Sequence, residues 1–242
     1  CVPKYSNPQG YTYSPETVEA FAALKPAADD FRIFWDNAYG MHHLYDHRQD
    51  YLIEILAECK RAGNPDMVYK FASTSKICFP GSGVSAIATS LNNLEDIKKQ
   101  LAHQTIGHDK LNQLRHVKFF GTPENLLAHM KKHAAIIRPK FEITLKAFRE
   151  KLTGIATWTE PAGGYFIDLR VPDGCAKAVY ALAAEAGVAL TKVGASYPYG
   201  VDPRDRHLRI APTFPSNADL EVAVNILCTC VELAALRQAA NN

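Results

Sequence analysis

The sequence predicts an α/β protein in which short strands alternate with helices along one mostly parallel sheet. Residues 31–35 and 68–72 are short apolar runs of β-forming residues, and residues 49–61 between them repeat apolar side chains at helical spacing. Strand, helix, strand is the order that builds a parallel sheet. A third run, residues 84–89, follows a Pro-Gly-Ser-Gly turn so closely that we expect it beside the strand at 68–72.

The pattern changes in the C-terminal part of the chain. Residues 122–152 repeat apolar side chains three or four apart, which predicts one long helix with Thr122 as its N-cap, Pro123 in its first turn and a kink or break at Pro139. Further on we expect strands at 165–169, 188–191 and 207–210 and helices at 175–186 and 217–237. We therefore divide the chain into the end of a large domain, residues 1–135, and a long connecting helix with a small α+β domain, residues 136–242.

Composition excludes several classes of protein. The 242 residues include 27 Lys plus Arg and 25 Asp plus Glu, and 47% of them are hydrophobic, which is ordinary globular composition rather than that of a disordered or fibrous chain. No apolar run approaches the roughly 18 residues of a membrane span, and no basic cluster indicates a nucleic acid. Without a membrane span or the pattern of a signal peptide, we expect a cytoplasmic location. The six cysteines lack zinc-ligand spacing, so in that compartment we expect free thiols and no metal site.

Polar residues follow the two strands of the predicted parallel pair. Ligands of such sheets bind beyond the carboxyl ends of the strands, where Asp36 and residues 73–76 lie. Lys76 stands between the strand at 68–72 and the turn at residues 80–83. A partly desolvated lysine there is a nucleophile toward aldehydes, and the neighbouring hydroxyls and glycine amides suit a phosphate. Taken alone, Lys76 is better explained as a solvated lysine in a serine-rich turn.

Five segments occur together in one order. They are Asn7-Pro8-Gln9-Gly10, Asp36-Asn37-Ala38-Tyr39, Ser73-Thr74-Ser75-Lys76, Gly163-Gly164 and the run from His207 to Pro212 that contains Arg209. In this order and spacing, over essentially the whole chain, they resemble the active-site signature of fold-type I pyridoxal-phosphate enzymes, specifically class I/II aminotransferases. The run Ser-Thr-Ser-Lys-Ile, with His42-His43-Leu44 after Tyr39, is most similar to the divergent bacterial MocR-type aspartate aminotransferase group.

The resemblance implies a pyridoxal 5'-phosphate site with catalytic residues Lys76, Asp36 and Tyr39. Lys76 is similar to the lysine that forms the Schiff base and then moves the proton, and Asp36 to the carboxylate that pairs with the pyridine nitrogen. Tyr39 and Asn7 match residues that hydrogen-bond the ring oxygen. As alternatives, Asp36 would merely cap a helix, and Asn7 would belong to an ordinary turn.

The resemblance also implies phosphate and substrate contacts. Ser73, Ser75 and Ser82 match the phosphate-binding region. Arg209, with Asn7, matches the residues that grip the substrate carboxylate, for which a guanidinium offers two parallel hydrogen bonds. The sequence departs from the common pattern at Val84, where these enzymes usually carry a phosphate-binding arginine. Gly163-Gly164 is alternatively explained by a close backbone approach.

The resemblance implies transamination between an amino acid, aspartate or glutamate, and a 2-oxo acid, in a homodimer with a shared site. The polar segment at residues 107–116 either reaches the partner's cofactor or is a solvated loop, and Arg115 is our candidate for a second substrate carboxylate. We expect His129 and His133 at the surface. The alternatives are an effector-sensing domain of a transcription regulator, or another pyridoxal-phosphate reaction such as decarboxylation.

The resembled enzymes place a phosphate loop and a ring-stacking aromatic residue before the Asn-Pro-x-Gly turn. Six residues precede Asn7 here. We therefore expect the sequence to be the C-terminal part of a longer chain.

Overall fold

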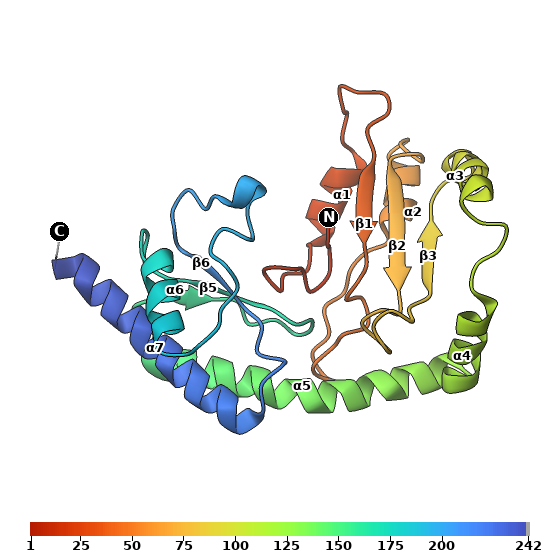
Figure 1. The fold of residues 1–242 in the computed structure, drawn as a ribbon. Helices are drawn as coiled ribbons and strands as arrows, with labels where there is room; N and C mark the ends of the chain where they lie inside the picture. The colour runs from red at the N-terminus through yellow and green to blue at the C-terminus, as the bar shows by residue number, and fades with distance from the viewer. Residues whose placement is uncertain (241–242) are drawn as a thin grey trace. The chain divides into compact units, whose positions relative to one another are not determined.

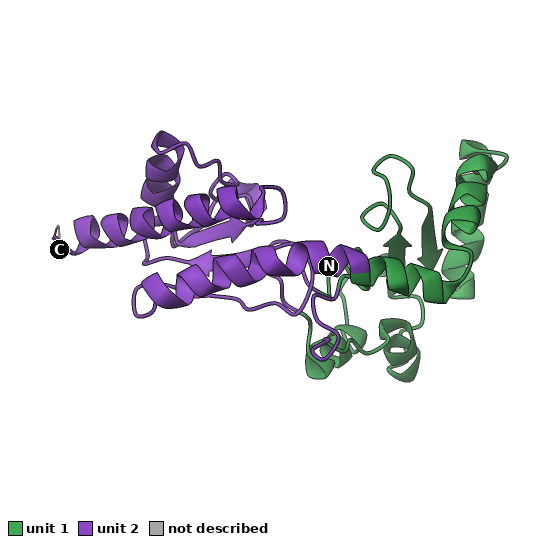
Figure 2. Ribbon diagram, turned by 90° about the horizontal axis from the view of Figure 1, so that it is seen from below, with its two compact units in different colours: residues 1–4, 12–42, 50–131 green, residues 5–11, 43–49, 132–242 purple. Residues whose placement is uncertain are grey.

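The computed structural model describes residues 1–240, which form two compact units. Unit 1 comprises residues 1–4, 12–42 and 50–131, and unit 2 comprises residues 5–11, 43–49 and 132–242 within the described range (Figure 2). Two short N-terminal segments therefore belong to the same unit as the C-terminal part of the chain.

Unit 1 contains a three-stranded sheet in the order β1-β2-β3, formed by Ile33–Asp36, Val68–Ser73 and Ser85–Ala88 (Figure 1). The strands β1 and β2 are parallel, as the strand, helix, strand order predicts. The third strand lies beside β2, as expected, but runs antiparallel to it, because the turn at residues 80–83 reverses the chain. The carbonyl oxygen of Cys1 accepts a hydrogen bond from Asp36 N, so the N-terminal segment lies along the free edge of β1.

Two helices cover one face of this sheet. They are α1, Pro15–Ala22, and α2, Ile55–Arg61. Their buried side chains form one apolar cluster with the strands: Val18, Ala22, Ile33, Trp35, Ile55, Cys59, Met67 and Val68. The predicted helix at 49–61 is correct in kind but too long, because Glu54 accepts a hydrogen bond from Ala57 N and caps the helix there.

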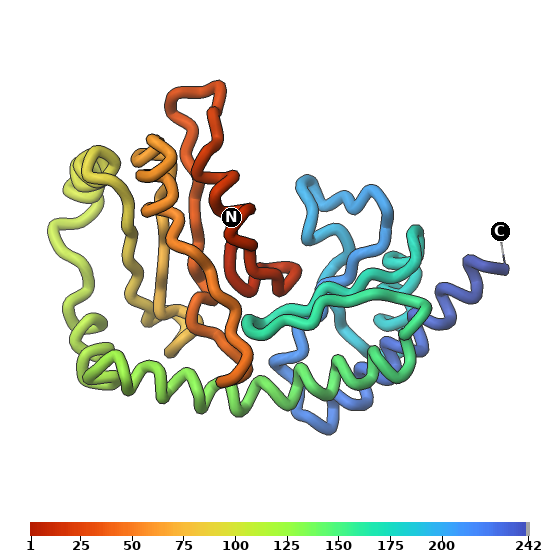
Figure 3. Tube along the Cα trace, turned by 180° about the vertical axis from the view of Figure 1, so that it is seen from behind, coloured from red at the N-terminus to blue at the C-terminus, as the bar shows by residue number. Residues whose placement is uncertain are grey.

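Two further helices, which the sequence analysis did not identify, follow the sheet. They are α3, Leu91–Gln104, and α4, Lys110–Phe120, and the tube in Figure 3 follows the chain through both of them into α5. Of the two alternatives for residues 107–116, the solvated loop is wrong from Lys110 onward, where α4 begins. Asp109 caps α4 by accepting a hydrogen bond from Asn112 N.

The long helix predicted at 122–152 is α5, Pro123–Lys151. Thr122 accepts a hydrogen bond from Asn125 N through its hydroxyl, as expected of an N-cap. Of the kink or break expected at Pro139, the break does not occur, since the helix continues through this residue. Buried residues on both sides of it, Ile137 and Phe141, pack into one core and stabilise the turns that proline weakens.

Unit 2 contains a second sheet, which is antiparallel throughout. Its order is β4-β5-β6, formed by Thr157–Trp158, Ile167–Arg170 and His207–Ile210. Helices α6, Ala176–Glu185, and α7, Asn217–Ala240, and the short 3-10 turn η1, Pro198–Gly200, complete it. The core joins α5, α6, α7 and the sheet through fully buried side chains such as Phe148, Leu169, Val179 and Leu227.

The predicted strand at residues 188–191 is wrong. Val188 N donates to Ala183 O after the turn at Gly187, and Val188 and Leu190 pack against the core without joining the sheet. The apolar character of this segment reflects packing and not strand pairing.

Over the described residues, all six cysteines are free thiols and no group of His, Cys, Asp and Glu has the arrangement of a metal site. Within the same range, every helix is too short or too polar to cross a membrane.

Candidate active site

The carboxyl ends of β1 and β2 bring the first candidate residues to one edge of the sheet in unit 1. Asp36 is the last residue of β1 and lies opposite Phe71 in β2, and Ser73 ends β2. Asn37 N donates to Phe71 O, which continues the pairing one residue beyond β1. Parallel strands end on the same side, so the Asp36 carboxylate and the segment that follows Ser73 share this edge.

Lys76 lies over an aromatic ring at this edge. Its Nζ is 4.9 Å from the centroid of the Tyr39 ring, close enough for a cation–π contact. The two residues differ in exposure, because Tyr39 is 3% exposed while the Lys76 side chain is open to solvent. Asp36 is also exposed. A buried ring thus supports an accessible amine, which is the arrangement that a ligand-binding lysine needs.

The segment after β2 presents hydroxyl groups. Ser73 Oγ donates to Ser75 Oγ over 2.8 Å and accepts from Ser75 N over 3.0 Å. A Cβ at Gly83 would lie 2.4 Å from Ser75 Oγ and 3.2 Å from the backbone of Ser75, so a larger residue would push the turn and the serine apart. The side chain of Ser82 is partly exposed on the same turn. These hydroxyl groups lie close to the glycine turn and include donors that suit an anion.

Val84, which stands where an arginine was expected, has a role in closing the loop. Thr74 N donates to Val84 O, and Val84 N donates to Thr74 Oγ1, both over 2.9 Å. The backbone of Val84 therefore joins the two ends of the lysine segment, and its side chain offers nothing to a phosphate.

Asn7 and Arg209 meet in unit 2. Arg209 Nη1 donates to Asn7 Oδ1 over 2.8 Å, and Nη2 donates to Thr191 Oγ1 over 3.4 Å. The guanidinium carbon lies 5.0 Å from the centroid of the Phe166 ring. Arg209 Nε is buried without a hydrogen-bond partner in the described structure. A buried N–H that lacks an acceptor is costly, so this guanidinium is suited to an anionic ligand.

Two glycines make the Asn7 turn possible. Gly10 has φ of +70°, and a Cβ there would lie 2.6 Å from the carbonyl oxygen of Phe166. Gly164 has φ of +78°, and a Cβ there would lie 2.8 Å from the Cβ of Tyr5. The close backbone approach considered for the Gly163-Gly164 pair therefore exists at Gly164. It seats the segment before Asn7 against the loop that leads to Phe166.

The sequence analysis missed a buried charge network on the same face of the unit 2 sheet. Asp168, 2% exposed, pairs with Arg170 over 2.8 Å and with His207 Nδ1 over 3.0 Å. Burial opposes the charge of Arg170, but the hydrogen bond that its Nε donates to the Asp168 carboxylate holds its pKa above the ordinary value. Asp168 is also the cross-strand neighbour of Arg209 in the β5–β6 ladder. The sequence did contain a sign of this network, because Asp168 and Arg170 alternate along β5 and face Arg209 and His207 of β6.

Two histidines contact the backbone of the lysine segment. His42 Nε2 contacts Lys76 O over 3.0 Å, and His129 Nε2 contacts Ile77 O over 2.9 Å. His129 is partly buried, so its expected place at the surface is wrong. His133 is also partly buried and contacts the Tyr165 hydroxyl within unit 2. Lys110 and Arg115 are exposed on α4.

Solved structures share this fold. An aspartate transaminase from Corynebacterium glutamicum superposes with a TM-score of 0.94 at 44% identity, and a putative aminotransferase from Corynebacterium diphtheriae with a TM-score of 0.93 at 45%. These superpositions cover 98% of this chain and 56% and 58% of the other two chains. The architecture is therefore that of an aminotransferase, an α/β fold followed by a small α+β unit.

The family follows from the sequence comparisons. The family model described as aspartate amino-transferase matches residues 1–242. The aspartate aminotransferase of C. glutamicum is 45% identical over 242 residues, which cover 99% of this chain and 56% of the relative. The chain therefore belongs to the aspartate aminotransferase family, as the resemblance of its motifs implied. It spans about half the length of the curated relatives it matches.

Proposed function

We propose that the protein is a pyridoxal-phosphate-dependent aminotransferase, which moves an amino group between aspartate or glutamate and a 2-oxo acid. The observation that carries this proposal is Lys76, an accessible amine over the buried Tyr39 ring, beyond the ends of two parallel strands of which one ends in Asp36. The relatives matched along the whole chain are named as aminotransferases, and this favours transamination over a regulator domain or a decarboxylase.

The residues present fit this cofactor. Lys76 supplies an amine for its aldehyde, and Asp36 a carboxylate for its ring nitrogen. Ser73 and Ser75, together with the glycine turn at Gly83, supply donors and space for its phosphate in place of the arginine absent at Val84. When bound, pyridoxal phosphate withdraws electrons from the substrate's Cα–H bond.

The chain's own residues supply binding and proton transfer. Asn7 and Arg209 bind the α-carboxylate, since the fork of a guanidinium and the amide of Asn7 both match carboxylate oxygens. Asp36 would pair with the ring nitrogen and keep it protonated, and the Tyr39 hydroxyl would hold the ring oxygen. The contact of Asn7 with the same oxygen stays a prediction of the family resemblance. Lys76 would hold the aldehyde of the cofactor, and its free amine would be the base that takes the proton from the substrate Cα.

The remaining features of the proposal rest on the family likeness. They are the choice of a dicarboxylic substrate, with Arg115 as the candidate for its second carboxylate, the homodimer with a shared site, and the cytoplasmic location. The division into domains at residues 135 and 136 also stays a prediction, beside the structural units described above.

The direct test is the covalent linkage. Borohydride reduction of the protein with pyridoxal phosphate, followed by peptide mass spectrometry, should label Lys76. Lys76→Ala should abolish both the label and amino-group transfer from aspartate, whereas Lys118→Ala, at an exposed position of α4, should leave both unchanged. A reducible linkage that persists in Lys76→Ala contradicts the proposal.

A further inference from the structure

Three histidines from separate parts of unit 1 contact four residues of the segment 74–78 around Lys76. His42 follows β1, His116 lies in α4, and His129 lies in the first turns of α5. Their Nε2 atoms lie 3.0 Å from Lys76 O, 2.7 Å from Thr74 Oγ1 and 2.9 Å from Ile77 O, respectively. His116 Nε2 also lies 3.2 Å from Cys78 Sγ. The segment from Thr74 to Cys78 is thus held by side chains on both sides of Lys76.

The chemistry of the partners fixes the direction of these hydrogen bonds. A carbonyl oxygen only accepts, so Nε2 of His42 and of His129 each donates. His116 Nδ1 lies 2.8 Å from the carbonyl oxygen of Asn112 and donates to it, so in the neutral ring Nε2 accepts from the Thr74 hydroxyl. This contact of 2.7 Å is shorter than the 3.4 Å from the same hydroxyl to Val84 O. Thr74 Oγ1 in turn accepts from Val84 N. One chain of hydrogen bonds therefore runs from Val84 through Thr74 and His116 to Asn112.

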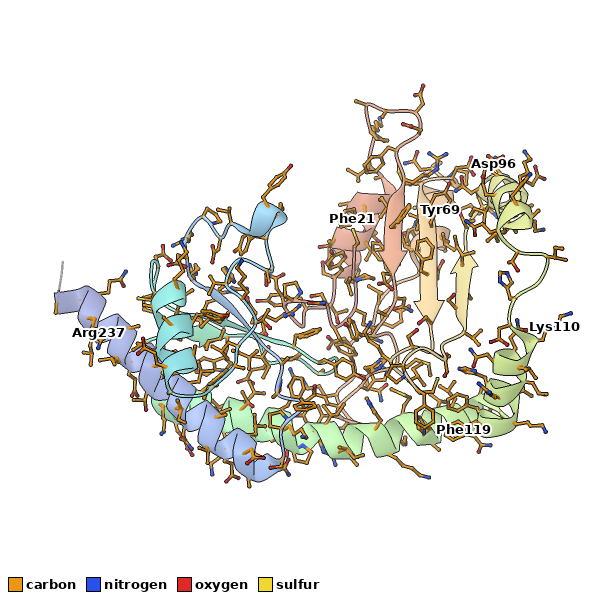
Figure 4. The ribbon with its side chains drawn as sticks, in the orientation of Figure 1. Phe21, Tyr69, Asp96, Lys110, Phe119 and Arg237 are labelled. Atoms are coloured by element: carbon orange, nitrogen blue, oxygen red, sulfur yellow. The ribbon has the colours of Figure 1, made fainter. Side chains whose placement is uncertain are left out.

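The surroundings of these histidines keep them in place. His42 is 4% exposed, and Asn112, one turn before His116, is 8% exposed and donates to Ser82 O and Gly83 O. The rings of Phe119 and Phe120 contact the His129 ring edge-on, at centroid distances of 5.5 and 5.6 Å. Figure 4 shows Phe119 where α4 is followed by α5. The helices α4 and α5 therefore hold both ends of the lysine segment.

We propose that His42, His116 and His129 are positioning residues that fix the main chain around Lys76 and so present its amine in one direction. The inference rests on the proposed function of Lys76. The Lys76 side chain is exposed, so the hydrogen bonds to its backbone and to its neighbours restrict where the amine reaches. A reacting group that is displaced by about 1 Å loses on the order of a hundredfold in rate, which makes such restriction valuable.

The test compares variants that remove the hydrogen bond with variants that keep it. His42→Leu and His129→Leu remove the donor, while His42→Gln and His129→Gln keep an N–H that reaches a carbonyl. Thr74→Val removes the hydroxyl that links Val84 to His116, and Thr74→Ser keeps it. His108→Leu, at an exposed site between α3 and α4, is the matched control.

We expect the Leu variants and Thr74→Val to lower kcat at least tenfold with KM for the amino acid within threefold, because positioning affects the reacting complex more than binding. In the same variants without cofactor, amide hydrogen exchange of residues 73–84 should be at least tenfold faster. The Gln variants, Thr74→Ser and His108→Leu should stay within about threefold of the wild type in both measurements.

Unchanged kcat in the Leu variants and in Thr74→Val overturns the proposal, whether or not hydrogen exchange changes. So does an equal loss in the matched Gln and Ser variants, because the hydrogen bond is then not the cause. If a Leu variant fails to fold, the comparison of Thr74→Val with Thr74→Ser still tests the proposal, because both variants keep all three histidines. A wild-type protein without a reducible linkage at Lys76 contradicts the proposed function instead, and the hydrogen exchange of the cofactor-free protein still tests the contacts.

Discussion

Arg209 Nη1 donates a hydrogen bond to Asn7 Oδ1 over 2.8 Å, although 202 positions separate the two residues in the chain. The contact aligns the guanidinium with an amide that itself offers two N–H donors. Together with the buried Nε of Arg209, which has no partner in the described structure, it forms a site with donors in excess of acceptors. Such a site is complementary to a carboxylate.

Arg209→Lys should lower kcat/KM for amino acid substrates more than tenfold. A lysine keeps the charge but loses the planar fork, and a charge-assisted bidentate contact contributes about 1.5–3 kcal/mol. Steady-state kinetics with aspartate and glutamate measure the loss. Arg204→Lys is the control, because Arg204 pairs with Asp173 at the surface. A kcat/KM for Arg209→Lys within threefold of the wild type contradicts the proposal that Arg209 binds the carboxylate.

Asp36→Asn should lower kcat roughly 100-fold while the reducible linkage at Lys76 remains. Removal of one preorganised charge from a reacting centre typically has an effect of about this size, and formation of the linkage requires only the amine. Asp30→Asn, at an exposed position before β1, should match the wild type. Equal kcat in Asp36→Asn and Asp30→Asn means that Asp36 only ends its strand.

The sequence predicted the strand ends and the motif order because both are local features. Asp36 and Ser73 each follow a short apolar run, and such runs identify strands without knowledge of the fold. The helix α4 was missed for the opposite reason. It buries Asn112 and Phe120 while it exposes Leu111, Leu114 and other apolar residues, so its sequence lacks the usual apolar stripe.

Contacts between segments that are distant in the chain could not be predicted from the sequence either. A histidine such as His129 is typical of the exposed face of a helix. Its contact with the carbonyl oxygen of Ile77 depends on where α5 lies in the fold. Asp168 and Arg170 alternate in a strand like ordinary exposed residues, yet Asp168 is buried in an ion pair. A pattern records which side chains share a face and not what that face packs against.

Gly164→Ala should destabilise the protein more than Gly154→Ala by roughly 1–3 kcal/mol, which is the cost of overpacking. Both glycines belong to unit 2 and have positive φ, +78° and +85°, so both variants carry similar backbone strain. The added Cβ meets Tyr5 at 2.8 Å in Gly164→Ala and nothing within 4 Å in Gly154→Ala. Urea unfolding measures the difference, and equal free energies of unfolding contradict the close approach.

The buried thiol of Cys228 should make unit 2 less stable in alkali. Burial raises the pKa of this thiol from 9.0 to about 11. Because the folded pKa is raised, the neutral thiol favours the folded state fully below the unfolded pKa of 9.0, and this contribution is lost as the pH rises through about 11. A shift of this size corresponds to at most about 2–3 kcal/mol.

Urea unfolding of the wild type and of Cys228→Ala between about pH 8 and about pH 11 tests this linkage. The variant should be less stable at the lower pH, because it leaves a cavity where Cys228 is fully buried, but its free energy of unfolding should fall less steeply in alkali. Lysine and tyrosine titrate in both proteins, so their effect cancels in the difference between the two curves. Parallel curves would mean that the thiol ionises as readily in the folded chain as in the unfolded one, and that its burial has no bearing on alkaline stability.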